Sequence, residues 1–260
     1  MLAPFYKYQG TGNDFIILNN SSGEYHQLGN ATVRDLCDRH FGIGADGLML
    51  FNKKEGFDFE MVYFNSDGHT GSMCGNGGRC IVQFAYDLGI KKYTYKFLAS
   101  DGVHEAEIDM NGTIRLKMND VNEVNEQAEY SLLNTGSPHY VLFVQDVKNI
   151  DVLLKGREIR YSKEFAEKGV NVNFVELLDK ETIYVRTYER GVEAETLSCG
   201  TGVTAAALLC AHNSPGFNRV SVKTPGGNLN VEYHKTDNSH FSNIWLCGPA
   251  LLSFKGEIEI

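Results

Sequence analysis

Short hydrophobic runs, rich in β-branched and aromatic residues, recur along the whole chain and are separated by Gly, Asn and Asp. Runs of this length and composition are typical of β-strands. The predicted strands are FIILN (15–19), LMLFNK (48–53), DFEMVYFN (58–65), YTYKFLA (93–99), TIRLKMN (113–119), HYVLFVQ (139–145), NFVELLD (173–179), TIYVRTY (182–188), VSVKT (220–224), LNVEYH (229–234) and NIWLCG (243–248).

Helical patterns are fewer. The spacing of apolar residues predicts helices over 31–41, 78–88, 162–169 and 203–212, the last of them almost wholly apolar. Gly89 is a suitable C-terminal stop for the second helix, and Ser162 is a suitable N-cap for the third. The sequence therefore predicts an α+β protein in which strands dominate.

The two halves of the chain repeat each other. Cys74-Gly-Asn-Gly matches Cys199-Gly-Thr-Gly at an offset of 199 − 74 = 125. Other matching segments, at offsets of 124 or 125, are Thr11-Gly-Asn with Thr135-Gly-Ser, FNSDG (64–68) with YERG (188–191), and GADGLMLF (44–51) with GVNVNFVE (169–176). A repeat of this kind predicts duplication. We expect two pseudo-symmetric domains, 1–121 and 122–249, separated near the polar segment 119–131, with the active site in the cleft between them.

Charge and cysteine usage narrow the class of protein. The formal net charge of −9 and the lack of a basic run argue against a nucleic-acid partner. No apolar stretch approaches the ~20 residues of a membrane span, and no signal peptide is visible, so we expect a cytoplasmic enzyme. The six cysteines are expected to be free thiols, because the chain is neither small nor visibly secreted. Neither a Cys-x-x-Cys nor a His-Glu-x-x-His motif occurs, so no metal site is expected.

Both Cys-Gly-x-Gly segments stand just before a predicted helix. The first turn of a helix presents unpaired N–H groups and the positive end of the helix dipole, which favour a thiolate and can bind a carboxylate. Two such turns facing each other would suit proton transfer on both faces of one carbon. Cys74 and Cys199 would then act as thiolate base and thiol acid, in a racemase or epimerase that needs no cofactor.

The motifs carry a family resemblance. The chain resembles diaminopimelate epimerase in Gly10-Thr-Gly-Asn-Asp-Phe, Gly42-Ile-Gly-Ala-Asp, Phe64-Asn-Ser-Asp-Gly, Met73-Cys-Gly-Asn-Gly-Gly-Arg-Cys80, Gly136-Ser-Pro-His, Gly169-Val-Asn-Val-Asn-Phe, Tyr188-Glu-Arg-Gly and Ser198-Cys-Gly-Thr-Gly202. The resemblance implies conversion of L,L-diaminopimelate to the meso form, for lysine and peptidoglycan precursors, without pyridoxal phosphate. It implies that each domain wraps a curved mixed sheet around a central helix, and that the last strand (about 250–260) returns to the first domain. A homodimer is compatible with it.

The resemblance also implies roles for particular residues. Cys74 and Cys199 would be the acid/base pair, assisted by His139 and Glu189. The reacting carboxylate would be held by the backbone N–H groups of Gly75, Asn76, Gly200 and Thr201, and the rest of the substrate by Asn13, Asn65, Asn171, Glu189 and Arg190. Arg190 suits the distal carboxylate, since a guanidinium fork can bind both oxygens. Gly47 and Ser137 depart from the commonest family pattern, and neither is included in the site.

Several alternatives stay open at this point. Gly42–Gly47 spells G-x-G-x-x-G, but a helix precedes it and a strand follows, the reverse of a dinucleotide site. Arg79 is expected at a helix surface or interdomain contact, and Cys37, Cys80, Cys210 and Cys247 are expected in the core. A proline or hydroxyproline racemase and a redox-sensing thiol protein are the competing functions. The first lacks a use for Asn65, Asn171 and Arg190 together, and the second predicts a functional disulfide form.

Overall fold

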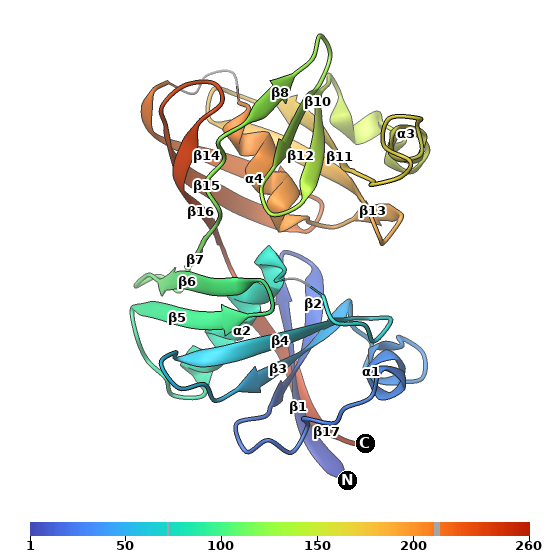
Figure 1. The fold of residues 1–260 in the computed structure, drawn as a ribbon, viewed down its shortest axis with the longest axis vertical. Helices are drawn as coiled ribbons and strands as arrows, with labels where there is room; N and C mark the ends of the chain where they lie inside the picture. Colours follow the sequence, from blue (N-terminus) through green and yellow to red (C-terminus); the bar gives the residue numbers. More distant parts are fainter. Residues whose placement is uncertain (72, 211–213) are drawn as a thin grey trace. The chain divides into compact units, whose positions relative to one another are not determined.

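The computed structural model describes residues 1–71, 73–210 and 214–260, and these divide into two compact units (Figure 1). Unit 1 comprises Met1–Leu116 and Pro249–Ile260, and unit 2 comprises Lys117–Gly248. The observed division lies between 116 and 117, whereas the predicted one lies between 121 and 122. The shift arises because Met118 and Val121 pair with Ile244 and Phe241 of unit 2 (Met118 N–Ile244 O, 2.9 Å).

The described residues of unit 1 form ten strands and helices. Its elements are β1 (Leu2–Gly10), β2 (Asn13–Asn19), α1 (Asn30–Cys37), β3 (Gly47–Asn52), β4 (Phe59–Asn65), α2 (Gly75–Asp87), β5 (Thr94–Ala99), β6 (Gly102–Ile108), β7 (Ile114–Lys117, whose last residue belongs to unit 2) and β17 (Leu251–Glu259). The C-terminal strand β17 pairs antiparallel with β1, so the two ends of the chain meet at Met1 and Ile260.

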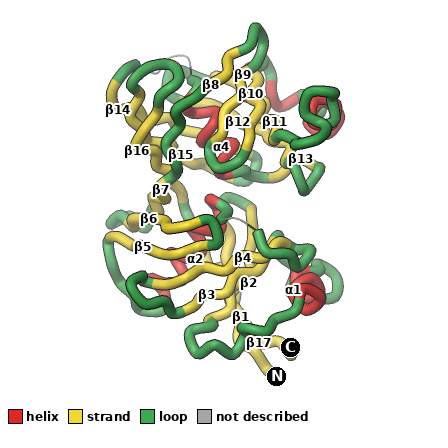
Figure 2. Tube along the Cα trace, viewed as in Figure 1, coloured by secondary structure: helices red, strands yellow, loops and turns green. Residues whose placement is uncertain are grey.

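Unit 2 follows the same plan. Its elements are β8 (Val124–Glu126), β9 (Ser131–Asn134), β10 (Pro138–Phe143), the 3₁₀ turn η1 (Val147–Asn149), α3 (Val152–Arg160), β11 (Asn171–Leu177), β12 (Thr182–Glu189), β13 (Ala194–Thr196), α4 (Gly200–Leu208), β14 (Gly216–Thr224), β15 (Gly227–Lys235) and β16 (Phe241–Gly248). Figure 2 separates the helices from the strands and loops of both units.

Strand register demonstrates the duplication. β2 pairs parallel with β3 through Phe15 and Gly47, and β10 pairs parallel with β11 through His139 and Asn171, which are 139 − 15 = 171 − 47 = 124 residues further on. β3–β4 and β11–β12 are both antiparallel, and a parallel strand follows in each unit, β5 beside β4 and β14 beside β12. The predicted α+β fold with two repeated mixed-sheet domains is confirmed.

One helix fills the core of each unit. α2 packs against β1, β2, β3 and β17, and ten of its residues are buried. α4 packs against β10, β11, β12, β14, β15 and β16, and all its residues except Thr201 are buried. Both helices begin three residues before the predicted starts, at glycines, because burial against the sheet outweighs the low helix propensity of Gly. The predicted positions 211 and 212 of the second helix lie outside the described residues.

The third predicted helix is wrong. Residues 162–169 form successive turns, ended at Gly169 with φ +71°, and the helix lies earlier, at α3. Asp151 caps α3 by accepting the Leu154 N–H at 2.9 Å. The pattern missed this helix because Gly156 lowers its propensity, yet a Cβ at Gly156 would lie 2.4 Å from the Cβ of Tyr188. A glycine is therefore needed where α3 meets β12.

Candidate active site

Cys74 stands at the N-terminus of α2. It is the N-cap residue, with extended φ and ψ of −94° and 131°, and its carbonyl accepts the Gly78 N–H at 2.7 Å. The first N–H groups of such a helix have no acceptor within the helix and point out of its end. The Cys74 thiol is partly exposed and lies 3.5 Å from Asn13 Oδ1, to which it donates.

The side chain of Asn13 is held in one orientation. Its Nδ2 donates to Asp46 Oδ2 at 2.6 Å, while its Oδ1 also accepts from Asn76 Nδ2 at 3.3 Å. Asn13 thus contacts both Cys74 and Asn76, which lie 61 and 63 residues further along the chain. Asp46 is not among the residues expected from the sequence, although it lies in the Gly-Ala-Asp motif. Asn65 ends β4 and is exposed, and its backbone N–H donates to His69 O at 2.9 Å.

Cys199 occupies the matching position in unit 2. It is the N-cap of α4, with φ −111° and ψ 110°, and its carbonyl accepts the Val203 N–H at 2.8 Å. Its Sγ lies 3.4 Å from Thr201 Oγ1, and the residue is only 7% exposed. The Thr201 carbonyl accepts from Thr135 Oγ1 at 2.8 Å, which joins the Thr-Gly-Ser turn to the helix end. Each repeated Cys-Gly-x-Gly segment therefore begins a buried helix.

His139 lies in a buried polar network beside α4. Asn173 Nδ2 donates to His139 Nδ1 at 3.1 Å and to Tyr140 O at 3.0 Å, while Asn173 Oδ1 accepts from Thr187 Oγ1 at 3.0 Å. Nδ1 is thus the acceptor, and Nε2 carries the hydrogen with no hydrogen-bond partner among the described residues. Burial, helped by the charge of Arg190, lowers the pKa of His139 from 6.5 to about 3. The imidazole is therefore neutral.

Three predicted binding residues meet at the ends of β11 and β12. Asn171 begins β11, and its Oδ1 accepts the Arg190 N–H at 2.8 Å. Its Nδ2 donates to Ser137 Oγ at 2.8 Å, so Ser137, left out by sequence reasoning, contacts a candidate residue. Glu189 ends β12 and accepts from Thr196 Oγ1 at 2.9 Å. Arg190 is exposed, and one guanidinium nitrogen donates to Lys168 O at 2.9 Å.

The expected surface position of Arg79 is wrong. The residue is 0% exposed and lies within unit 1. Its Nη1 donates to Gly75 O at 3.2 Å, and its Nη2 donates to Asn76 Oδ1 at 3.0 Å and Thr11 Oγ1 at 3.3 Å. Arg79 therefore binds the turn that carries Cys74.

The other cysteines match their predicted role. Cys37, Cys80, Cys210 and Cys247 are buried, and none of the six cysteines, all of which lie in the described ranges, forms a disulfide. Burial raises the pKa of Cys37 to about 12 and raises that of Cys80 further, so both remain protonated. The described ranges contain no group of three or more His, Cys, Asp or Glu residues placed to hold a metal ion. Within the same ranges, none of the helices combines the length and apolar character of a membrane span.

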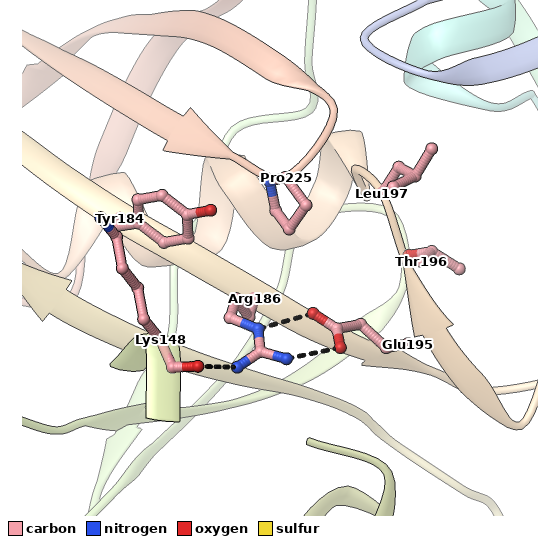
Figure 3. Close-up of a pocket in the computed structure, with 7 residues that line it drawn as sticks. All are labelled: Lys148, Tyr184, Arg186, Glu195, Thr196, Leu197 and Pro225. Atoms are coloured by element: carbon pink, nitrogen blue, oxygen red, sulfur yellow. Dashed lines mark hydrogen bonds and ion pairs between the residues drawn. The ribbon is translucent and has the colours of Figure 1, made fainter. Parts of the chain in front are cut away.

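A separate pocket of about 420 Å³ lies in unit 2 (Figure 3). Its lining residues are Lys148, Tyr184, Arg186, Glu195, Thr196, Leu197 and Pro225. Arg186 binds Glu195 through Nε and Nη2 at 2.6 and 2.7 Å, and its Nη1 donates to the carbonyls of Val147, Lys148 and Ile150. None of the predicted site residues lines this pocket. Its ion pair holds β13 against β12, just before Cys199.

Comparison with known proteins identifies relatives along the whole chain. The family model for diaminopimelate epimerase matches residues 5–124 and 131–251, one segment for each repeat. The diaminopimelate epimerase of Flavobacterium psychrophilum is 48% identical over 97% of this chain and 99% of its own length. That of Chlorobaculum tepidum is 41% identical over 96% of this chain and 99% of its own.

Solved structures of more distant proteins share the fold. A PhzF-family phenazine biosynthesis protein from Bacillus anthracis has a TM-score of 0.78 at 15% identity, with both chains fully covered. A hydroxyproline epimerase from Agrobacterium vitis has a TM-score of 0.70 at 13% identity, covering 99% of this chain and 91% of its own. At such identities the likeness concerns the fold alone. From its repeated motifs, the two helix-capping cysteines and the match along both halves, the chain belongs to the diaminopimelate epimerase family.

Proposed function

We propose that this protein is a diaminopimelate epimerase, an isomerase that inverts one α-carbon of L,L-2,6-diaminopimelate to give the meso form. The observation that carries the proposal is the pair of cysteines that cap two repeated, buried helices, in a chain 48% identical to a diaminopimelate epimerase. A proline-type racemase is less well supported, because the hydroxyproline epimerase shares only 13% identity.

The chemistry we propose uses the two thiols as the acid and the base. One thiolate removes the α-hydrogen as a proton, and the electron pair left on the α-carbon delocalises into the neighbouring carboxylate. The other thiol then delivers its proton to the opposite face of that carbon. One substrate proton is lost and one is gained, and the thiol and thiolate forms have exchanged places. This step requires Cys74 and Cys199 to face each other across a cleft between the units.

The helix ends supply stabilisation for the carbanion. Negative charge on the carboxylate oxygens grows as the proton leaves, so donors directed at those oxygens lower the barrier. The N–H groups at the starts of α2 and α4, from Gly75, Asn76, Gly200 and Thr201, are the donors we assign to this task. The positive ends of the two helix dipoles act in the same direction. Removing one such donor typically costs 10²–10³-fold in rate.

The remaining site residues are assigned to substrate binding and to support of the thiols. Asn13, Asn65 and Asn171 would bind the polar groups of diaminopimelate, and the exposed guanidinium of Arg190 would bind its distal carboxylate. Glu189 would support the thiols during proton transfer. Because His139 is neutral, it would assist only as a hydrogen-bond donor through Nε2, never as a cation. A cytoplasmic location and a place in lysine and peptidoglycan precursor synthesis belong to the same proposal.

Deuterium exchange tests the function. The protein is incubated with L,L-diaminopimelate in D₂O under reducing conditions, and the product is analysed for configuration and for deuterium at the α-carbons. The expected result is meso product labelled at one α-carbon for the unmodified protein, and loss of epimerisation for Cys74→Ala and for Cys199→Ala. Cys37→Ala is the control, because this thiol is buried, as that of Cys199 is, but lies in the hydrophobic core of unit 1.

Two outcomes would contradict the assignment. Diaminopimelate left unchanged by the reduced protein would overturn the substrate, and proline and hydroxyproline would then be tested in the same assay. Epimerase activity that survives or rises after oxidation of the thiols would contradict the two-thiol mechanism, since a disulfide between Cys74 and Cys199 could carry no proton. That result would favour a redox-sensing thiol protein.

A further inference from the structure

The two repeated helices differ in charge directly behind their cysteines. Arg79 lies five residues after Cys74, and the matching residue five after Cys199 is Thr204, since 204 − 79 = 199 − 74 = 125. Both side chains are 0% exposed. A charge buried in protein acts over a longer range than an exposed one, because neither water nor salt screens it effectively. The repeat therefore places a guanidinium in one half and a hydroxyl in the other.

Arg79 and Thr204 make the same contact with the backbone. Arg79 Nη1 donates to the Gly75 carbonyl at 3.2 Å, and Thr204 Oγ1 donates to the Gly200 carbonyl at 2.9 Å. Each side chain thus reaches back four residues to the first residue of its helix. The two positions are structurally equivalent, and the difference between them is one of charge.

The Arg79 guanidinium is also connected to the Cys74 thiol through further hydrogen bonds. Arg79 Nη2 donates to Asn76 Oδ1 at 3.0 Å, which turns Asn76 Nδ2 toward Asn13 Oδ1 at 3.3 Å. The same Asn13 oxygen accepts from Cys74 Sγ at 3.5 Å. A connected path of hydrogen bonds therefore runs from the buried cation to the thiol, and Arg79 fixes the orientation of both amides along it.

Other ionisable groups are linked to the Cys74 turn. Asp46 binds Asn13, and Cys80 of α2 interacts with Cys74 and with Asp14 of β2. Lys7 of β1 and Arg39 of the loop before β3 bind these carboxylates, and Asp101 contacts the Met73 backbone and His104 of β6. Four of these form a paired cluster of two cations and two carboxylates: Lys7–Asp14, Arg39–Asp14 and Arg39–Asp46. Burial alone would raise the pKa of Asp14, but hydrogen bonds from Arg39 and Lys7 hold it at about 2.

Asp101 and Cys80 complete this set. The hydrogen bond from His104 and one from the Met73 backbone lower the pKa of Asp101, so its charge lies close to the Cys74 turn and opposes a thiolate. Cys80 remains a neutral thiol. Around Cys199, α4 contributes no ionisable side chain within its bounds, β10 contributes the neutral His139, and β12 ends at Glu189 with Arg190 next to it.

Two opposed influences therefore act on Cys74. The Asn13 oxygen accepts a hydrogen bond from the S–H group and so favours the thiol, whereas the buried Arg79 cation favours the thiolate. Cys199 has the helix end and the Thr201 hydroxyl, with Thr204 where the other half has its cation. We propose that Arg79 is a positioning residue that makes Cys74, and not Cys199, the thiolate of the resting enzyme. This inference rests on the proposed two-thiol function and assigns the resting role of each thiol within it.

Alkylation of the two cysteines in the unmodified protein tests the asymmetry first. The reduced protein is treated with iodoacetamide over a range of pH, and the Cys74 and Cys199 peptides are quantified separately by mass spectrometry. The pH of half-maximal alkylation rate is compared, because it is independent of how exposed each sulfur is. We expect the midpoint of Cys74 to be lower than that of Cys199 by about one pH unit. An equal midpoint, or a lower one for Cys199, overturns the proposal without any variant.

Variants then test the cause. Arg79→Met is expected to raise the Cys74 midpoint by about one pH unit, and Arg79→Lys, which keeps the charge, should restore most of that shift. Thr204→Val is the matched control in the other unit and should leave the Cys74 midpoint unchanged. A folded Arg79→Met protein with an unmoved Cys74 midpoint would refute the role of the guanidinium. No substrate is present, so this result is independent of the diaminopimelate experiment.

Discussion

Replacement of Gly202 by alanine gives a sharp test of the packing beneath Cys199. Gly202 is the third residue of α4, and a Cβ built there would lie 2.3 Å from Asn173 Oδ1 and 3.3 Å from Thr187 Oγ1. Both atoms are buried and hydrogen-bonded to each other. The new methyl group would therefore have to displace the Asn173 amide from its network.

The expected cost follows from the contacts that would be lost. Overpacking of a well-filled core typically costs 1–3 kcal/mol, and a buried polar group left without its partner costs a further 1–3 kcal/mol. The higher helix propensity of alanine returns up to about 1 kcal/mol. We expect Gly202→Ala to lower the free energy of unfolding by about 3 kcal/mol.

Urea unfolding of Gly202→Ala and Gly77→Ala is the assay. Gly77 is the matched control, because it holds the same position in α2 and its Cβ would meet only ordinary contacts, the nearest at 3.4 Å from Met49 Sδ. Gly77→Ala should change the free energy of unfolding by less than about 1 kcal/mol. Equal losses in the two variants, or a Gly202→Ala protein as stable as the parent, would refute the argument that the Asn173 amide leaves no room for a side chain.

Two further predictions concern unit 2. The pKa of His139 is about 3 in the folded protein and about 6.5 when unfolded. The neutral side chain therefore contributes its full stabilisation to the folded state above pH 6.5, and this stabilisation is lost as the pH falls from 6.5 toward 3. His139→Gln should therefore lose less stability between about pH 7 and 5, measured by urea midpoints; an acid loss equal to that of the parent would contradict this. Arg186→Met should lower the free energy of unfolding by about 3 kcal/mol, because it leaves the Glu195 carboxylate without its half-buried partner. A double-mutant cycle with Glu195→Gln measures the coupling energy between Arg186 and Glu195. A coupling energy near zero would show that this ion pair does not stabilise the fold.

The repeat could be predicted from the sequence because matching motifs at one offset are local signals. Residue types at Cys74 and Cys199, with glycines after each, were enough to place both cysteines at helix starts. Strand patterns were similarly informative: ten of the eleven predicted runs lie within a strand except for at most two residues, and the run at 113–119 overlaps the shorter strand Ile114–Lys117. The hydrophobic pattern did not identify β17, which only the family resemblance implied, because most of its residues are exposed and the alternation is weak.

The position of α3 and the burial of Arg79 were harder to predict, because both depend on contacts with residues from other elements. Arginine is almost never fully buried without partners, so a surface position was the natural expectation. One of its partners, Thr11, lies 68 residues away, and no local pattern announces that contact. Gly156 in α3 is similar, since its need for a small residue comes from Tyr188 on another element.

By itself the sequence determined the duplicated plan, the two cysteines at helix starts and the family, because these depend on residue types and on spacing along the chain. Tertiary structure alone decided the state of the groups around those cysteines: the locked amide of Asn13, the neutral imidazole of His139 and the buried cation of Arg79. These properties depend on burial and on partners tens of residues away. A hydrogen bond or a desolvated charge is set by three-dimensional neighbours, which no single stretch of sequence contains.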